Sequence, residues 1–269
     1  MAAKLAVIGG GKMGSALVGG LLASGWATPA ELCIVEYSAS QREALQAKFP
    51  GVLVADQASP GFVEATGGVV LAVKPDQSEG VCTILGALGI ERVLSVAAGI
   101  STQRLQAKLG PNGRVVRAMP NTAALVGAGM SAIAGGDSTT SADLDWAESL
   151  LSAVGTVVRI PERQMDAVTA ISGSGPAYLF LVAEAMTDAG VQVGLTREQA
   201  HALVVATFTG AAKLMEESDE SPVELRAQVT SPAGVTAAGL RVLEMKGVRS
   251  AFIETVMTAS ERSFQLGRG

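Results

Sequence analysis

The chain has 269 residues, a formal net charge of −5 and a hydrophobic fraction of 48%, so it can form one large or two modest folded domains. Aromatic residues make up only 4% while glycine occurs 32 times, so small aliphatic side chains must build the core. The acidic balance argues against nucleic acid as the main partner, and no apolar run reaches the roughly 18 residues of a membrane-spanning helix.

Histidine and cysteine are too scarce for several kinds of site. The single histidine, His201, lies in a helical pattern and excludes Ser-His-Asp triads and multi-histidine metal sites unless it serves itself. Cys33 and Cys82 lie in apolar runs and form neither a disulfide framework nor a metal set, which indicates a reduced, cytoplasmic protein. The N-terminus is typical of a strand and turn rather than a signal peptide.

Residues 1–160 alternate β-rich runs with helical stretches, which is typical of an α/β domain with a parallel sheet and helices on both faces. The expected strands are 5–8, 32–35, 52–54, 69–73, 93–97, 115–117 and 156–159. The expected helices are 12–23, 40–49, 76–88, 102–109 and 142–153.

After Pro161 the strand signals nearly vanish. Capping-box patterns at Thr196–Gln199 and Ser221–Glu224 mark two helix starts. The expected helices are 177–189, 197–218, 222–229, 233–246 and 248–266. Residues 161–269 are therefore predicted to be an all-helical domain that packs alone or against a second copy of the chain.

A glycine-rich turn joins the first expected strand to the first expected helix. Gly9, Gly11 and Gly14 fit the G-x-G-x-x-G pattern, with Lys12 and Met13 between them. In this context the first glycine permits a tight turn, the second lets a pyrophosphate approach the backbone, and the third lets helix and strand pack closely. We expect dinucleotide binding here, against the alternative of a glycine-rich turn without a ligand.

The end of the second expected strand carries conflicting signals about the cofactor. Glu36 lies 22 residues after Gly14, where an acid can bind the ribose 2′-hydroxyl of NADH. Ser38, Ser40 and Arg42 follow, and hydroxyls with an arginine suit the 2′-phosphate of NADPH. The residues alone leave the choice between NADH and NADPH open.

Later strand ends add further candidates for the same crevice. Lys74 follows Ala72 and Val73, and it can contact phosphate, ribose or an anionic substrate, or only cap the strand. Ala97 belongs to a run of small residues on which a flat ring can lie, and Asn121 follows the sixth expected strand.

Two segments of the helical half are also candidates. Residues 170–178 contain Ser172-Gly173-Ser174-Gly175-Pro176, which is no nucleophile elbow and fits a tight helix connection as well as a contact site. In residues 230–236, Ser231 is predicted to be the N-cap of a helix whose first-turn N–H groups can bind a carboxylate. A plain capped helix start is the alternative.

Together these segments resemble the pyrroline-5-carboxylate reductase family over essentially the whole chain. The resemblance rests on the glycine turn, on Ala72–Pro75, on Ala97–Gly99, on Arg117–Thr122, and most specifically on residues 167–178 and 230–236. The family usually has Ser-Pro-Gly-Gly where this chain has Ser-Pro-Ala-Gly, and we expect a helix first turn to accept Ala233.

The resemblance implies an N-terminal Rossmann domain, a C-terminal helical dimerisation domain, and NADPH or NADH as cofactor. The reaction it implies is reduction of 1-pyrroline-5-carboxylate, a cyclic imine, to L-proline, the last step of proline biosynthesis. In this reading Lys74 and Ala97 place the nicotinamide and its ribose, and Ser231 with the N–H groups of Gly234, Val235 and Thr236 holds the substrate carboxylate. The Thr236 hydroxyl forms a hydrogen bond with the substrate ring nitrogen, and its loop completes the active site across a subunit boundary.

Two other functions compete with this one. The β-hydroxyacid dehydrogenases also begin with a glycine-rich turn, but they use a lysine on a helix shortly after a Ser-Gly segment. Here the first lysine after Ser172-Gly173 is Lys213, so that catalytic lysine is missing. A regulatory dimer that senses NADPH without turnover is the non-enzyme alternative.

Overall fold

The computed structural model describes residues 3–59 and 67–268. Its centre is a sheet of eight strands in the order β3-β2-β1-β4-β5-β6-β7-β8, in which only the β6–β7 pair is antiparallel. The strands are β1 (Leu5–Ile8), β2 (Leu32–Val35), β3 (Leu53–Ala55), β4 (Val69–Leu71), β5 (Arg92–Ser95), β6 (Arg114–Pro120), β7 (Gly129–Gly135) and β8 (Gly155–Arg159). The strand order reverses between β1 and β4, and such a switch point opens a ligand crevice at the carboxyl ends of the strands.

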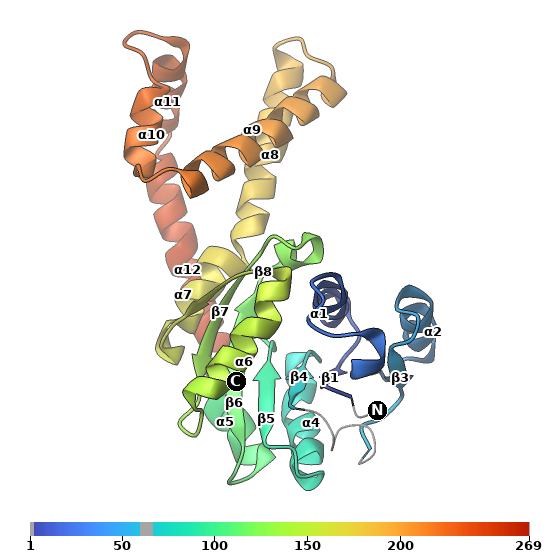
Figure 1. Ribbon diagram of the computed structural model, residues 1–269. Helices are drawn as coiled ribbons and strands as arrows, with labels where there is room; N and C mark the ends of the chain where they lie inside the picture. The colour runs from blue at the N-terminus through green and yellow to red at the C-terminus, as the bar shows by residue number, and fades with distance from the viewer. Residues whose placement is uncertain (1–2, 60–66, 269) are drawn as a thin grey trace. The chain divides into compact units, whose positions relative to one another are not determined.

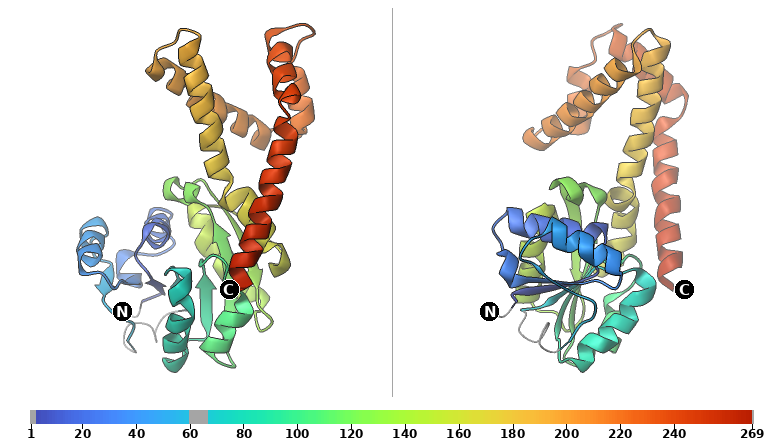
Figure 2. Two further views of the ribbon diagram at one scale, coloured as in Figure 1. Left: turned by 180° about the vertical axis from the view of Figure 1, so that it is seen from behind. Right: turned by 90° about the vertical axis from the view of Figure 1, so that its right-hand side faces the viewer.

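Helices cover both faces of this sheet (Figures 1 and 2). The helices of this part are α1 (Lys12–Ala23), α2 (Ala39–Lys48), α4 (Pro75–Ala87), α5 (Thr102–Leu109), α6 (Ser141–Leu151) and α7 (Met165–Val168). One core places Leu17, Leu45 and Leu150, from α1, α2 and α6, against strand residues such as Val7. The other core places Leu85 of α4 and further residues of α5 against the opposite face. Alternate residues of each buried strand therefore serve different cores.

An ion-pair network around a buried aspartate connects α6 to strands β5 and β6. Asp143 is fully buried in the first turn of α6, and its Oδ1 accepts a 2.6 Å hydrogen bond from Nε of Arg92 on β5. Arg114 on β6 also pairs with Asp143, at 3.3 Å. Hydrogen bonds from Thr140 and the charge of Arg92 outweigh desolvation by burial, so the pKa of the Asp143 carboxyl is lowered.

The chain divides into two compact units, and each is described by itself. The first unit runs through Ser174 and takes in the end of the last helix from Ala259 onward, while the second is Gly175–Thr258. The predicted boundary at 160 thus falls inside the first unit. Met165 of α7 explains the extension, because it packs with Ala132 and Ala134 of β7 in a small third core.

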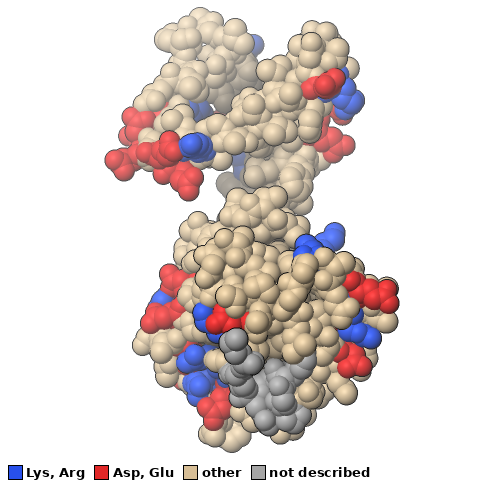
Figure 3. Space-filling model, turned by 45° about the vertical axis from the view of Figure 1, so that its right-hand side comes forward, with Lys and Arg blue, Asp and Glu red and all other residues tan. Residues whose placement is uncertain are grey.

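The second unit is entirely helical. It contains α8 (Gly175–Gln192), α9 (Arg197–Glu217), α10 (Pro222–Gln228), α11 (Val235–Met245) and the beginning of α12 (Val248–Arg268). Although every residue of 175–258 is described, only Thr187, Ala200, Val204 and Leu225 are buried. Large apolar side chains stand exposed instead, among them Phe180 at 69% and Met257 at 67%. Figure 3 shows mostly uncharged atoms over these helices, as expected of a unit that needs a partner to cover it.

The structure confirms most of the elements expected from the sequence. Strands 5–8 and 32–35 and helices 12–23 and 102–109 have the predicted bounds, and most of the others differ by one to three residues. Strand β7 and the short helix α7 were not predicted, and β6 is longer than expected. No helix in the described ranges is long and apolar enough to cross a membrane.

Candidate active site

The three glycines of the N-terminal turn have three different environments. Gly9 has φ +104°, and a Cβ there would lie 2.6 Å from the carbonyl oxygen of Ala72. A Cβ on Gly14 would lie 2.0 Å from the carbonyl oxygen of Gly9, so the start of α1 passes directly over β1. A Cβ on Gly11 would meet nothing within 4 Å. Two glycines are therefore required by packing, whereas Gly11 leaves open space above the backbone.

That open space fits a phosphate group. Gly11 is the N-cap of α1 and has no side chain that could cap the helix. The N–H groups of Lys12, Met13 and Gly14, at the start of the helix, therefore have neither a helical partner nor a capping side chain. A cavity of about 230 Å³ opens beside this turn, and its lining includes Gly11, Lys12 and Ser15. The backbone donors, the helix dipole and the Lys12 side chain all favour an anion here, so the residues present fit a dinucleotide pyrophosphate.

The turn between β2 and α2 carries the residues expected to meet the adenosine ribose. Both carboxylate oxygens of Glu36 accept backbone hydrogen bonds, from the N–H groups of Gly10 and Ser38, each at 2.9 Å. Ser38 is the N-cap of α2, and its hydroxyl lies 3.1 Å from that of Ser40. Nη1 of Arg42 donates to the carbonyl oxygens of Glu36 and Tyr37. Serine hydroxyls and the start of a helix are thus available to a ligand, while the Arg42 guanidinium holds the turn together.

Three further candidates follow the strands on the other side of the switch point. Lys74 is exposed and is the N-cap of α4, directly after Ala72 and Val73. Ala97 is buried after β5, where its N–H donates to the Ser95 hydroxyl at 3.3 Å. Asn121 follows β6, and its side-chain oxygen accepts hydrogen bonds from the N–H groups of Ala123 and Met130. The fold therefore brings the predicted cofactor residues to the carboxyl ends of β1, β2, β4, β5 and β6.

The Ser231–Thr236 segment lies in the second unit, and its helix begins later than predicted. The N-cap of α11 is Gly234 rather than Ser231, and the first helical residue is Val235 rather than Pro232. Residues 231–234 form a turn closed by a 3.1 Å hydrogen bond from the Gly234 N–H to the Ser231 carbonyl oxygen. In this structure the Gly234 N–H, which is predicted to hold a carboxylate, is engaged within the turn. The start of α11 instead offers the N–H groups of Val235 and Thr236.

The expectation for Ala233 also changes. Ala233 is not in a helix first turn but has φ +56°, and it is the only non-glycine residue with positive φ among those described. This is the third position of a four-residue turn, which favours glycine. Next to it, a Cβ on Gly234 would lie 2.3 Å from Oγ of Ser231, so the serine hydroxyl is packed against the backbone at the start of α11.

The candidate segment 170–178 begins with a conformation that was not predicted from the sequence. Residues Thr169–Gly173 form a π-helical turn, in which the Ser174 N–H donates to the Thr169 carbonyl oxygen at 2.8 Å. A Cβ on Gly173 would lie 2.7 Å from Cε of Met119, near the end of β6. Such turns frequently occur at functional sites. The Ser-Gly-Ser-Gly run between two apolar stretches was the available signal, since it interrupts regular helix.

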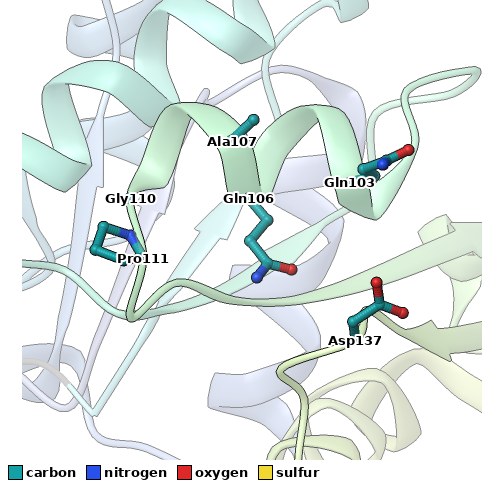
Figure 4. A pocket seen from close by; sticks show the side chains of 6 residues that line it. All are labelled: Gln103, Gln106, Ala107, Gly110, Pro111 and Asp137. Carbon is teal, nitrogen blue, oxygen red and sulfur yellow. The ribbon is translucent and has the colours of Figure 1, made fainter.

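Three other features involve no predicted site residue. A surface hollow of about 360 Å³ is lined by Gln103, Gln106, Ala107, Gly110, Pro111 and Asp137 (Figure 4). His201 is exposed on α9. Lys213, the first lysine after Ser172-Gly173, is exposed on α9 and pairs with Glu217 one turn later.

Comparison with known proteins agrees with this geometry. Residues 162–266 match the family model described as pyrroline-5-carboxylate reductase dimerisation, and residues 4–99 match that described as NADP oxidoreductase coenzyme F420-dependent. The chain is 42% identical to the pyrroline-5-carboxylate reductase of Synechocystis sp. over 269 residues, covering 100% of both.

Solved structures give the same result. The pyrroline-5-carboxylate reductase of Coxiella burnetii is 37% identical, with a TM-score of 0.91 over 99% of each chain. That of Plasmodium falciparum, determined with NADP bound, is 30% identical, with a TM-score of 0.86 over 98% of each chain. This chain belongs to the pyrroline-5-carboxylate reductase family.

Proposed function

We propose that the chain reduces 1-pyrroline-5-carboxylate to L-proline with a hydride from NADPH or NADH. The proposal rests on the different surroundings of the three glycines at the switch point. Gly9 and Gly14 are required by packing, whereas Gly11 leaves open space for a phosphate. Full-length similarity to reductases of this family supports the substrate.

In this proposal the first unit holds the cofactor. Gly9, Gly11 and Gly14 shape the turn, and the N–H groups of Lys12 and Met13 bind the pyrophosphate. Ser38 lies beside the adenosine ribose, and the backbone from Ala72 through Val73 to Lys74 lies along the middle of the dinucleotide. Ala97 and Asn121 lie on either side of the nicotinamide, which supplies the hydride when the cofactor is present.

The second unit supplies the substrate-binding residues. The Ser231 hydroxyl and the N–H groups of Val235 and Thr236 bind the ring carboxylate at the positive end of α11. The Thr236 hydroxyl oxygen accepts a hydrogen bond from the protonated ring nitrogen and so fixes which face of the ring receives the hydride. Lys74, in the first unit, provides a positive charge near the cofactor.

This chemistry needs orientation more than a strong acid or base. A protonated C=N bond is already electrophilic, and the hydride adds to its carbon while the proton stays on nitrogen. A site without histidine therefore suffices, and the exposed position of His201 on α9 is consistent with a role outside the chemistry.

We also propose that the working form is a homodimer in the cytoplasm. Exposed apolar side chains on α8, α9 and α12 need a partner, and the match to a dimerisation model indicates a second copy of the chain. Cys33 and Cys82 are both buried, and burial raises the pKa of each thiol to about 12, so neither is a reactive thiolate.

The proposal is tested by steady-state assays of the purified protein with two kinds of substrate. We expect rapid oxidation of NADPH or NADH with 1-pyrroline-5-carboxylate and no reduction of NADP⁺ or NAD⁺ with 3-hydroxy acids. Turnover of the hydroxy acids alone would favour the β-hydroxyacid dehydrogenase alternative. Cofactor binding without turnover of either substrate would favour a nucleotide sensor.

A further inference from the structure

We infer that Glu36 is a positioning residue that holds the glycine turn in its phosphate-binding form for NADPH and NADH alike, rather than a ribose ligand that selects between them. This inference rests on the proposed function, because it concerns how the cofactor is held. It concerns a role that the position of Glu36 at the end of β2 does not by itself reveal.

The Glu36 carboxylate connects two turns of the backbone. Oε2 of Glu36 accepts the Gly10 N–H at 2.9 Å, and Oε1 accepts the Ser38 N–H at 2.9 Å. One side chain thus joins the middle of the glycine turn to the turn that precedes α2. Hydrogen bonds from backbone N–H groups to a carboxylate are among the stronger ones in proteins.

Both backbone polar groups of Gly10 have side-chain hydrogen-bond partners. Its carbonyl oxygen accepts hydrogen bonds from Oγ of Ser15 at 2.9 Å and from Nε2 of Gln41 at 3.0 Å. A Cβ on Gly10 would lie 2.3 Å from Cδ1 of Leu45, so α2 packs directly against this peptide. The segment between the Gly9 turn and the open position at Gly11 is therefore fixed by groups of β2, α1 and α2.

The hydrogen bonds of Glu36 also affect how its charge acts on a bound cofactor. An acid that selects NADH presents its oxygens to the ribose diol and repels a 2′-phosphate. Here both oxygens of Glu36 are bound to N–H groups, and the Arg42 guanidinium donates to the Glu36 carbonyl oxygen at 3.0 Å. The two N–H groups, rather than the guanidinium, therefore stabilise the carboxylate charge, so its removal should disturb the turn more than it changes the preference between the two cofactors.

The experiment measures dissociation constants for NADPH and NADH by fluorescence titration of the full chain and three variants. In Glu36→Gln an amide NH₂ replaces one acceptor and faces a backbone N–H, so both dissociation constants should rise about tenfold with their ratio unchanged. Glu36→Asp keeps the charge but is too short to reach both N–H groups, and it should also weaken both cofactors. Glu43→Gln, which removes a charge from an exposed position on α2, should change neither.

A second readout separates positioning from general destabilisation. At saturating cofactor, Glu36→Gln should keep the kcat of the unaltered chain while KM for both cofactors rises, because the turn forms once a ligand is bound. A loss of kcat with unchanged dissociation constants would overturn the inference in favour of a purely structural role.

Other outcomes also overturn it. Tighter NADPH binding by Glu36→Gln, or retained NADH binding by Glu36→Asp, would make Glu36 a ribose ligand. If Glu36→Gln does not fold, Glu36→Asp decides by the same criterion. Failure of the unaltered chain to bind either nucleotide would contradict the proposed function as well, whereas a changed ratio in the variants would contradict the inference alone.

Discussion

Replacing Gly11 with alanine tests the proposed phosphate site with little disturbance of the fold. Gly11 has φ −66° and ψ −167°, which alanine adopts without strain, and its Cβ would meet nothing within 4 Å. The added methyl group occupies the open space in which the pyrophosphate is proposed to bind. Gly11→Ala should therefore keep the stability of the protein and lose cofactor affinity.

The size of the effect follows from the donors at the start of α1. A methyl group that displaces a phosphate from one or two N–H groups removes hydrogen bonds to a charged acceptor, worth about 1.5 kcal/mol each. The dissociation constants for NADPH and NADH should then rise about 10- to 150-fold, and by similar factors, because both cofactors share the pyrophosphate.

Titration calorimetry and thermal unfolding together provide the assay. Gly80→Ala on α4 is the matched control, since its Cβ also meets nothing within 4 Å, and it should bind both cofactors normally. Gly14→Ala is the opposite case, because a Cβ 2.0 Å from the Gly9 carbonyl oxygen should destabilise the fold itself. Normal cofactor affinity in a folded Gly11→Ala variant would refute the phosphate assignment.

Three other substitutions have defined outcomes. Thr236→Val keeps the shape of the side chain but loses the hydroxyl, and it should lower kcat/KM for the imine about 10- to 150-fold while cofactor dissociation constants stay the same; unchanged kcat/KM would argue against the bond to the ring nitrogen. Ala233→Gly should raise the thermal midpoint at fixed protein concentration, because relief of about 1–2 kcal/mol of strain at φ +56° exceeds the flexibility that glycine adds; a lowered midpoint would contradict this. Asp143→Asn should destabilise the protein by about 2–3 kcal/mol in denaturant unfolding at neutral pH, because it leaves Arg92 without its buried partner. The pKa of Asp143 in the folded protein is lowered from 3.8. Its contribution to the free energy of unfolding is therefore complete above about pH 4 and is lost as the pH falls through the folded pKa. The stabilities of the variant and the unaltered chain should thus converge in acid.

The glycine-rich turn and its place in the sheet could be predicted from the sequence because their signals are local. Gly9, Gly11 and Gly14 lie within one turn, and the alternating β-rich and helical runs place that turn at the switch point. The hydrogen bonds of Glu36 could not be predicted from the sequence, because the carboxylate comes close to the N–H groups of Gly10 and Ser38 only when β1 and β2 pair.

Elsewhere the local signals were weak or ambiguous. Strand β7, with the sequence Gly-Met-Ser-Ala-Ile-Ala-Gly, has mostly small residues, and pairing with β6 and β8 rather than strand propensity makes it extended. Pro232 suits a first helical position and a turn equally well, so the start of α11 was placed too early. The loss of strand signals after Pro161 did not reveal that α7 packs on the sheet through Met165.

The most direct test of the proposed reaction is to follow the hydride itself. The purified chain is incubated with 1-pyrroline-5-carboxylate and NADPH or NADH that carries deuterium at the transferred position of the nicotinamide. Direct reduction of the imine predicts one proline formed for each cofactor oxidised, with the deuterium on the ring carbon that was doubly bonded to nitrogen in the imine. Cofactor oxidation without proline, or proline without deuterium at that carbon, would contradict the assignment of this chain as a hydride-transferring imine reductase.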